Sequence, residues 1–195
     1  MIGSRPLRVS GNAAAPKPLS RPRQTAHALL LVCLLILLYL LIFRGMRFFR
    51  VPSGSMEPTI YSGDYIVTLT EERYARGDIV VLRDPEDKGG YIVKRIVGLE
   101  GDTVAVKSGA LALNGRYASE PYLYEPMEYE MAPYEVPPGN VVVLGDDRNA
   151  SDDSHMWQTR SLPKNSIVGK VRLVYLPFAR IRKVLSFPLV NSAGE

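Results

Sequence analysis

Residues 91–98 read YIVKRIVG, a run in which β-branched apolar residues flank a central lysine. Such a run predicts a strand, because β-branched side chains pack well on a pleated sheet. Side chains alternate between the two faces of a strand, so Ile92, Lys94 and Ile96 share one face and Arg95 points to the other. Lys94 therefore projects between two isoleucines. We expect loss of hydration, rather than the neighbouring arginine, to lower its pKa.

Similar runs on either side of this strand predict a mainly β domain. They are separated by Gly, Pro, Asp and Asn, and no long 3.6-residue period follows residue 50. The runs are DYIVTL (64–69), DIVVLR (78–83), DTVAVKS (102–108), NVVVLGD (140–146) and SIVGKVRLVYLP (166–177). We predict an antiparallel β-rich domain over 45–113 and 140–185, followed by a C-terminal tail at 186–195. Residues 114–139 hold five tyrosines, five prolines and five glutamates, which favours an exposed acidic insertion or long loop.

The N-terminal quarter of the chain differs in composition. Residues 26–43 read AHALLLVCLLILLYLLIF, and 18 residues span about 27 Å as a helix, close to the thickness of a bilayer core. We predict a transmembrane helix at 26–44, preceded by a disordered basic tail at 1–25. Five cations before the run and three arginines after it favour a cytoplasmic N-terminus. The alternative is a cleaved secretory signal, but RGMRFFRV (44–51) offers no small-x-small cleavage site.

Charge and cysteine content exclude several functions. The first 50 residues hold eight cations and no acid, so the remaining 145 residues carry a net charge of −4. The predicted domain has no basic patch in its sequence, and we expect no nucleic-acid partner. The only cysteine, Cys33, lies in the apolar run. Disulfides, a thiol nucleophile and cysteine metal ligands are therefore excluded from the domain.

A candidate nucleophile follows the apolar run, in RVPSGSMEPTI (50–60). A serine such as Ser55 needs a base to remove its proton. The chain has no G-x-S-x-G motif, and His155 is the only histidine after Ser55. A buried, neutral lysine is the other possible base, and Lys94 is the best placed for burial. Lys94 could instead be a lysine that reaches solvent at a sheet edge.

The polar segment LGDDRNASDDSHMW (144–157) allows three interpretations. It could be a solvated loop. It could be a calcium loop, but the sixth position is Asp152 rather than glycine and the twelfth is Gln158 rather than glutamate. In the third, an Arg–Asp pair braces a turn and a serine hydroxyl orients the base.

Three segments together resemble the bacterial type I signal peptidases, which are membrane-anchored Ser-Lys endopeptidases. PSGSMEPT (52–59) is similar to the nucleophile segment of that family, VKRIVGLEGD (93–102) to its lysine segment and GDDRNASDDS (145–154) to its structural segment. The resemblance covers roughly residues 28 to 177. It implies an antiparallel β-sheet catalytic domain of the signal-peptidase type, preceded by one N-terminal transmembrane helix.

The resemblance also implies a role for each matched residue. Ser55 would be the nucleophile and Lys94 the general base. The Ser55 amide and the Ser53 hydroxyl would form the oxyanion hole. The implied supporting residues are Ser151, which would orient Lys94, and Asp146, Arg148 and Asp153, which would hold the loop. The implied pocket residues, selective for small side chains, are Val51, Pro52, Met56, Ile60, Ile92 and Val93.

The implied function is removal of signal peptides from exported preproteins after an Ala-x-Ala sequence. It needs no metal and no cofactor. It implies a single-pass protein of the bacterial inner membrane, with lipid as a partner and the catalytic domain outside the cytoplasm. The sequence departs from the family at Asp147, where asparagine is usual, and at His155, where arginine is frequent; we expect the imidazole to play a minor structural part. The rival functions are a self-cleaving Ser-Lys hydrolase like the SOS-type repressors and a non-enzymatic β module.

Overall fold

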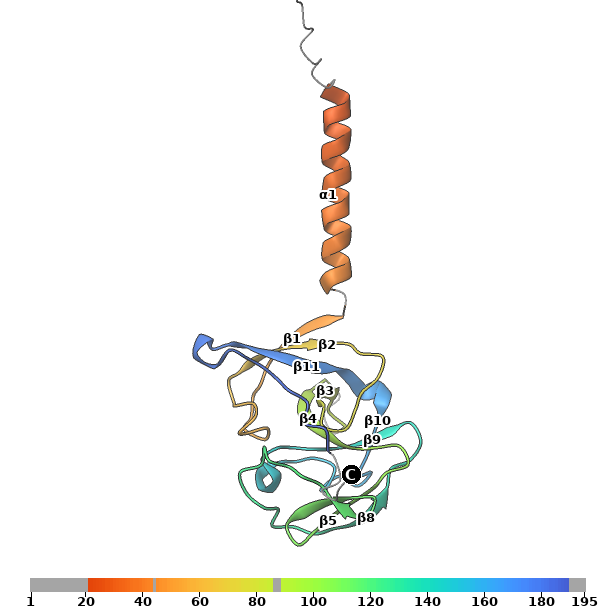
Figure 1. Ribbon diagram of the computed structural model, residues 1–195, viewed down its shortest axis with the longest axis vertical. Coiled ribbons are helices and arrows are strands. Elements are labelled where there is room, and N and C mark those ends of the chain that lie inside the picture. The colour runs from red at the N-terminus through yellow and green to blue at the C-terminus, as the bar shows by residue number, and fades with distance from the viewer. Residues whose placement is uncertain (1–20, 44, 86–88, 190–195) are drawn as a thin grey trace, which may run out of the picture. The chain divides into compact units, whose positions relative to one another are not determined.

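The computed structural model describes residues 21–43, 45–85 and 89–189. It divides the chain into two compact units, residues 1–44 and 45–195. The first contains the helix α1 (Arg21–Phe43), and the second contains every strand of the described residues (Figure 1). A mainly antiparallel β domain is therefore confirmed.

Helix α1 includes residues that the sequence assigned to the disordered tail. It begins at Arg21, and Pro22 is compatible with this start because proline is tolerated in the first turn of a helix. Residues 1–20 of the predicted tail lie outside the described residues. The side chains from Leu29 to Leu40 are exposed. Over the residues that the structure describes, no helix combines the length and the apolar character needed to cross a membrane, so the predicted span at 26–44 stays a prediction.

The larger of two sheets contains the lysine strand near its middle. Its strand order is β1-β2-β11-β3-β4-β9-β10, β12 also pairs with β11, and all the pairs are antiparallel. The bounds are β1 (Met46–Arg50), β2 (Tyr65–Leu69), β3 (Ile79–Arg83), β4 (Tyr91–Leu99), β9 (Asn140–Leu144), β10 (Leu162–Pro163), β11 (Ile167–Leu176) and β12 (Arg182–Lys183). The strand at 91–98 and the two runs that become β3 and β9 are thus neighbours in space.

The smaller sheet has the order β7-β6-β5-β8 and is also antiparallel. Its strands are β5 (Thr103–Lys107), β6 (Ala110–Leu113), β7 (Arg116–Tyr117) and β8 (Met131–Glu135). Strands β7 and β8 lie in the segment 114–139, for which we predicted an exposed insertion or loop. Pro133 is compatible with β8 because β8 is an edge strand, where a missing N–H costs no ladder hydrogen bond.

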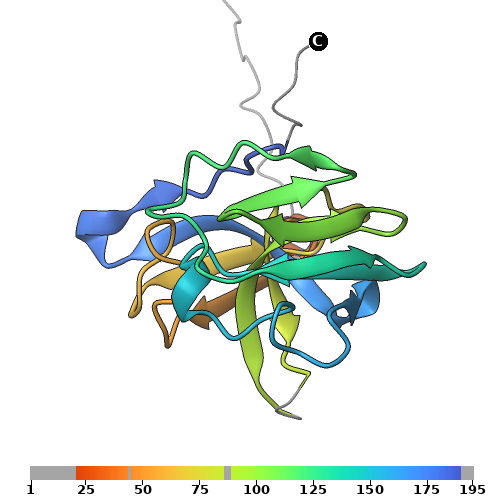
Figure 2. The same cartoon turned by 90° about the horizontal axis from the view of Figure 1, so that it is seen from below.

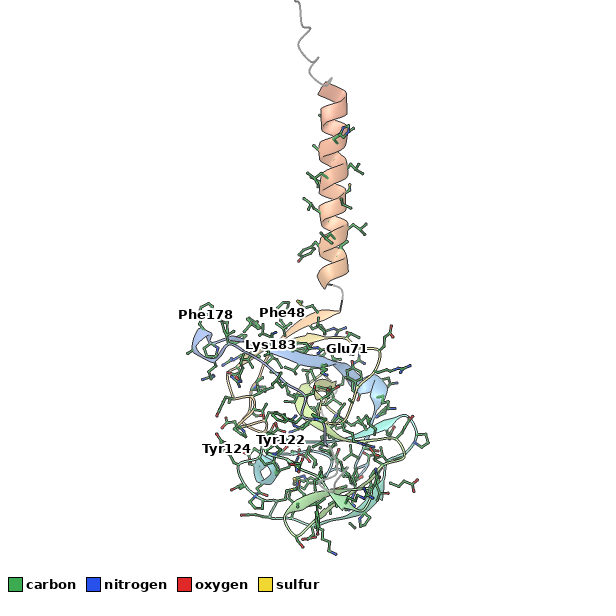
Figure 3. The ribbon with its side chains drawn as sticks, viewed as in Figure 1. Phe48, Glu71, Tyr122, Tyr124, Phe178 and Lys183 are labelled. Atoms are coloured by element: carbon green, nitrogen blue, oxygen red, sulfur yellow. The ribbon has the colours of Figure 1, made fainter. Side chains whose placement is uncertain are left out.

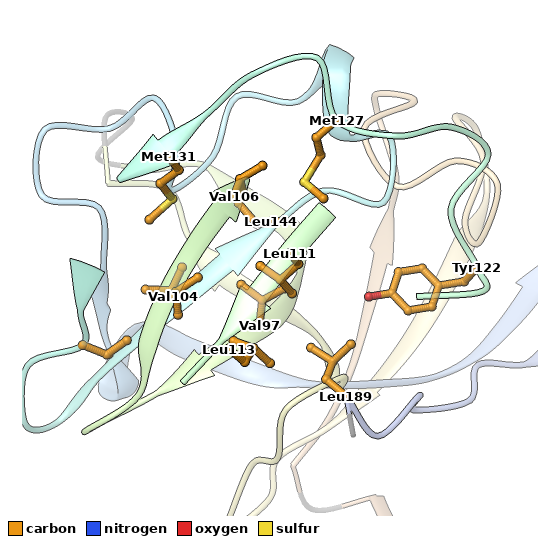
Figure 4. Close-up of a cluster of buried hydrophobic side chains, with 12 residues drawn as sticks. Val97, Val104, Val106, Leu111, Leu113, Tyr122, Met127, Met131, Leu144 and Leu189 are labelled. Atoms are coloured by element: carbon orange, nitrogen blue, oxygen red, sulfur yellow. The ribbon is translucent and has the colours of Figure 1, made fainter. Parts of the chain in front are cut away.

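The two sheets pack against one another through a shared apolar cluster. Figure 4 shows Val97 and Leu144 of the larger sheet beside Val104 and Leu111 of the smaller one. Figure 2 shows the green strands of the smaller sheet running alongside the teal strand β9. Burial of this cluster fixes the position of the smaller sheet behind β4 and β9.

The segment after β12 joins this cluster. Leu189 is buried among its side chains, and the Ser186 hydroxyl donates to the Asp78 carboxylate at 2.6 Å. The Phe187 ring lies 5.4 Å from that of Tyr122. Residues 186–189, which we predicted as part of a tail, are therefore packed on the domain, and residues 190–195 lie outside the described residues.

Candidate active site

The Ser55 segment has no regular secondary structure and is fixed at both ends. The Val51 amide donates to the Asp64 carbonyl at 2.8 Å, and the Asp147 amide donates to the Ser55 carbonyl at 3.1 Å. Met56 and Ile60 are buried in the apolar cluster beneath β2 and β11. Because neighbouring residues anchor the segment in the core, the Ser55 hydroxyl is held at the surface of the sheet rather than on a mobile linker.

Lys94 lies in β4 between β3 and β9, and it is only 3% exposed. On the same face of the strand as Lys94, Ile92 and Ile96 belong to an apolar cluster that includes Val80 and Trp157. The alternation expected from the sequence is thus present, and the ammonium group has little contact with solvent. The alternative of a lysine that reaches solvent at a sheet edge is wrong for this residue.

Ser55 and Lys94 line the same two cavities. The larger has a volume of about 440 Å³, and its walls also include Ile92 and Trp157. The smaller has a volume of about 60 Å³ and lies among Val51, Pro52, Ser53, Met56, Tyr91, Ile92 and Val93. The Ser53 and Ser55 hydroxyl oxygens are 3.5 Å apart. The two serines and the buried lysine therefore meet at one accessible place.

A chain of hydrogen bonds begins at the Lys94 ammonium group. Lys94 Nζ donates to Ser151 Oγ at 2.7 Å, and Ser151 Oγ donates to Asp153 Oδ2 at 2.6 Å. Asp153 Oδ2 also accepts from the Gly145 amide at 2.8 Å, and Asp153 Oδ1 lies 2.7 Å from His155 Nδ1. The single proton of the Ser151 hydroxyl is used on Asp153, so Ser151 acts as an acceptor toward Lys94.

This arrangement changes the proton affinities of two groups. Burial lowers the pKa of Lys94, and the nearby carboxylates, with Asp153 first among them, oppose the effect without overcoming it. Burial alone would raise the pKa of Asp153. Hydrogen bonds from His155, Ser151 and the Gly145 amide, with the charge of Lys94, hold the pKa of Asp153 below its usual range. The site therefore favours an ionised Asp153 beside a lysine that readily becomes neutral.

His155 occupies the outer end of the hydrogen-bond chain. Its ring stacks on Tyr129 with centroids 4.0 Å apart. Within the described residues, neither cavity that Ser55 lines has His155 in its walls. The structure therefore offers Lys94, and not His155, as the basic side chain that shares a cavity with Ser55.

Arg95 lies on the opposite face of β4 and is fully buried. Its Nε and Nη2 atoms donate to the two oxygens of Asp146 at 2.7 and 2.6 Å. Thr59 Oγ1 donates to Asp146 Oδ2 at 2.5 Å. One carboxylate thus ties the lysine strand, the serine segment and the loop after β9 together. Arg95 and Thr59 were not predicted as site residues, although an arginine inside an apolar strand signals a buried ion pair.

The Tyr/Glu/Pro-rich segment supports the same loop. Glu120 forms a two-pronged ion pair with Arg148, with N–O distances of 2.8 and 2.5 Å, and both side chains are nearly or fully buried. The Tyr122 ring lies 3.9 Å from the Arg95 guanidinium carbon. Tyr122 and Tyr124 are labelled in Figure 3; Tyr122 is buried, whereas Tyr124 is exposed. The segment is thus only partly the exposed insertion expected from the sequence.

The predicted pairing inside the loop differs from the observed one. In one of the three interpretations of residues 144–157, an Arg–Asp pair braces the turn. Instead, Arg148 pairs with Glu120 and Asp146 with Arg95, both outside the loop. Local spacing could not reveal these partners, which lie 28 and 51 residues away.

Most predicted site residues come together. Ser53, Ser55 and Lys94 share both cavities, and Ser151 and Asp153 continue from Lys94. Of the six predicted pocket residues, Val51, Pro52, Met56, Ile92 and Val93 line the small cavity. Ile60 does not line it and is fully buried in the core below.

Comparisons with known proteins identify the family of the chain. The model of the family "Signal peptidase, peptidase S26" matches residues 23–176. The chain is 33% identical over 190 residues to a probable signal peptidase I-1 of Synechocystis sp., covering 92% of this chain and 95% of the relative. It is 34% identical to a signal peptidase I of Bacillus licheniformis, covering 69% of this chain and 79% of the relative. A signal peptidase I structure from Enterococcus faecalis is 28% identical, with a TM-score of 0.42, and covers 52% of this chain and 98% of that one.

The chain therefore belongs to the signal peptidase family, peptidase S26. It is a hydrolase of the serine peptidase class, and the resemblance to type I signal peptidases is confirmed. Its family membership supports the removal of signal peptides from preproteins as its activity.

Gly145 provides a test of how closely the site is packed. A Cβ atom at this position would overlap both Ser151 Oγ and the Ser55 carbonyl oxygen. We predict that Gly145→Ala lowers kcat/KM for peptide cleavage by about 10²-fold, the scale seen when catalytic groups move by an ångström. The control is Gly89→Ala, since a Cβ at Gly89 meets no atom of the described residues within 4 Å. Equal activity of the two variants would show that the loop does not fix the site.

Proposed function

We propose that the chain is a membrane-anchored endopeptidase that uses Ser55 and Lys94 as a catalytic dyad to cut signal peptides after small residues. The observation that carries the proposal is that Ser55 lines the same cavities as a buried lysine whose pKa is lowered by burial. A neutral lysine is a competent general base for a serine hydroxyl.

In the proposed reaction, neutral Lys94 removes the Ser55 proton as the hydroxyl oxygen attacks the carbonyl carbon of the substrate. The ammonium form of Lys94 then protonates the leaving amine, which leaves an acyl group on Ser55. A water molecule, deprotonated by Lys94, hydrolyses that ester. Ser151 supports this cycle because it accepts a hydrogen bond from Lys94, so the lone pair of the neutral amine stays available for the Ser55 proton.

The negative charge that develops on the carbonyl oxygen requires hydrogen-bond donors. We assign the Ser55 amide and the Ser53 hydroxyl to this role. The 3.5 Å separation of the two serine hydroxyls supports the assignment, because a carbonyl attacked by one lies within reach of the other. Removing one donor of this kind typically lowers the rate by about 10²–10³.

Selectivity for small side chains is attributed to the smaller cavity. Its volume of about 60 Å³ corresponds to roughly two water molecules at liquid density. A methyl side chain fits this space, whereas an aromatic ring does not. Its apolar walls, with Met56 and Val93 among them, suit alanine in an Ala-x-Ala sequence. The larger cavity, on the side of Trp157, gives the rest of the peptide room.

Loss of either dyad member is predicted to abolish cleavage. Ser55→Ala removes the nucleophile and Lys94→Met removes the base, so each variant should lose at least about 10³-fold in kcat on an Ala-x-Ala preprotein. The measurement is gel analysis of the product with sequencing of its new N-terminus. An active Lys94→Met enzyme would contradict the dyad, and cleavage of the enzyme alone would point instead to the self-cleaving alternative.

The same assay should show a defined pH dependence. The neutral fraction of Lys94 grows as the pH rises through its folded pKa, and that pKa lies below the ordinary value of about 10.4. The wild-type kcat/KM is therefore expected to rise with pH and to level off before an ordinary lysine would titrate. A rate independent of pH from acid to alkaline conditions would argue against a neutral lysine as base.

Membrane attachment is proposed from the composition of residues 26–44. The 18-residue apolar run and the excess of cations before it support a single span with a cytoplasmic N-terminus. With that orientation, the catalytic domain would lie outside the cytoplasm of a bacterial cell. Signal peptides reach the same side of the membrane as they emerge.

Extraction of isolated membranes with alkaline carbonate tests the anchor. The full chain should stay in the membrane pellet, because carbonate releases surface-bound proteins but not embedded ones. Protease added to spheroplasts should digest the catalytic domain. Release of the chain into the carbonate supernatant would contradict the anchor, and protection of the domain from protease would contradict the orientation.

A further inference from the structure

The contacts of His155 assign it a part in the reaction that the sequence did not suggest. We infer that His155 is a positioning residue, which acts through Asp153 and Ser151 to hold Lys94 as an effective base. The inference rests on the proposed function of Lys94. It concerns the outer end of the hydrogen-bond chain, beyond the residues that contact a substrate.

Four consecutive side chains form this route without a gap. Lys94 Nζ contacts Ser151 Oγ at 2.7 Å, Ser151 contacts Asp153 Oδ2 at 2.6 Å, and Asp153 Oδ1 contacts His155 Nδ1 at 2.7 Å. The Asp153 side chain is fully buried, whereas that of His155 is 15% exposed. His155 is thus the most exposed of the four residues.

The two oxygens of Asp153 accept hydrogen bonds from different partners, and both groups of partners stabilise the buried carboxylate. Oδ2 accepts from Ser151 and from the Gly145 amide. Oδ1 accepts from the His155 amide at 3.2 Å and pairs with the imidazole at 2.7 Å. The imidazole must donate to this carboxylate, so its Nδ1 carries a proton. Without that donor, a fully buried carboxylate loses its closest contact on one oxygen, which is costly in a low-dielectric site.

The ring of His155 is fixed as well as its hydrogen bond. It stacks almost parallel to Tyr129, at 15° between the ring planes. Tyr129 lies in the segment before β8, so the Tyr/Glu/Pro-rich segment sets the direction of Nδ1.

The charged and titratable groups around His155 and its partners come from several elements. They are Asp152 and Asp153 on its own turn, Tyr129 on the stacked segment, Arg148 and Glu120 behind Tyr129, and Lys94 beyond Ser151.

Two consequences for Lys94 follow. First, a well-held Asp153 keeps the Ser151 proton, so Ser151 does not donate it to the lone pair that must accept the Ser55 proton. Second, a donor on Asp153 partly offsets the negative charge that attracts the Lys94 ammonium. Loss of the donor would therefore raise the proton affinity of Lys94 and move the active range of the enzyme to higher pH.

The test compares two substitutions in the full-length protein in detergent, with a fluorogenic Ala-x-Ala peptide as substrate. His155→Phe keeps a ring against Tyr129 but has no donor. His155→Asn is the conservative variant, because its amide nitrogen can take the place of Nδ1. Met156→Ala is the matched control, since Met156 is the next residue and is 67% exposed. The measurements are kcat and KM across a pH series, with melting temperatures.

We expect the rising limb of kcat/KM in His155→Phe to move by about half to one unit toward alkaline pH. Its KM should stay within about twofold of wild type, because His155 lines neither cavity that Ser55 lines. Its plateau kcat should fall by less than about tenfold, far less than in Ser55→Ala or Lys94→Met, because no catalytic group is removed. In His155→Asn and Met156→Ala, kcat/KM should rise at the same pH as in wild type. If His155→Phe fails to fold, His155→Ala and His155→Asn provide the same comparison.

Two results would overturn the inference while the proposed function stands. One is that the wild-type enzyme is active and the rising limb of kcat/KM lies at the same pH in His155→Phe as in wild type. The other is an equal loss of kcat in His155→Phe and His155→Asn, with no shift in the pH dependence of kcat/KM. That result would mean that His155 only stabilises the fold. A wild-type chain that cleaves no Ala-x-Ala peptide would refute the proposed function, and this inference with it.

Discussion

The Asp146 carboxylate is the point on which the rest of the site depends. It is buried, both of its oxygens accept from Arg95, and one also accepts from Thr59. These three residues come from the loop after β9, from β4 and from the segment that follows Ser55. Removing Arg95 would leave the buried charge of Asp146 uncompensated, at a cost of about 3–5 kcal/mol. The same pairing therefore fixes the serine segment against the lysine strand.

Strand β4 presents two adjacent cations to opposite faces, and their surroundings give them different properties. Arg95 contacts a carboxylate directly, and a guanidinium stays charged in proteins. Lys94 contacts the Ser151 hydroxyl, and the nearest carboxylate of this network, Asp153, is one hydrogen bond further away. Burial therefore prevails over attraction and lowers the pKa of Lys94. One cation is structural and the other is suited to accept a proton, although they are neighbours in sequence.

The sequence predicted those parts of the structure that local pattern determines. The six apolar runs became β2, β3, β4, β5, β9 and β11, because alternation and β-branching are properties of short segments. Strand β8 was missed because its edge position tolerates Pro133, which reads locally as a loop signal.

The partners in the site could be predicted only in part. Ser55, Lys94 and Ser151 were found through short motifs. The pairing of Arg148 with Glu120 and the stacking of Arg95 on Tyr122 depend on where the smaller sheet packs, and no spacing in the sequence encodes that. The pairing of Arg95 with Asp146 was not predicted either, because the two residues lie 51 positions apart.

The most direct test of this account is the titration of Lys94 itself. Lysine side chains labelled with ¹³C and ¹⁵N can be followed by NMR in the Ser55→Ala protein, with Lys94→Arg to assign the signal. The account predicts that Lys94 loses its proton well below the ordinary lysine range, because the strand and its neighbours remove the ammonium from water. Titration near about 10.4, with the other lysines, would contradict it.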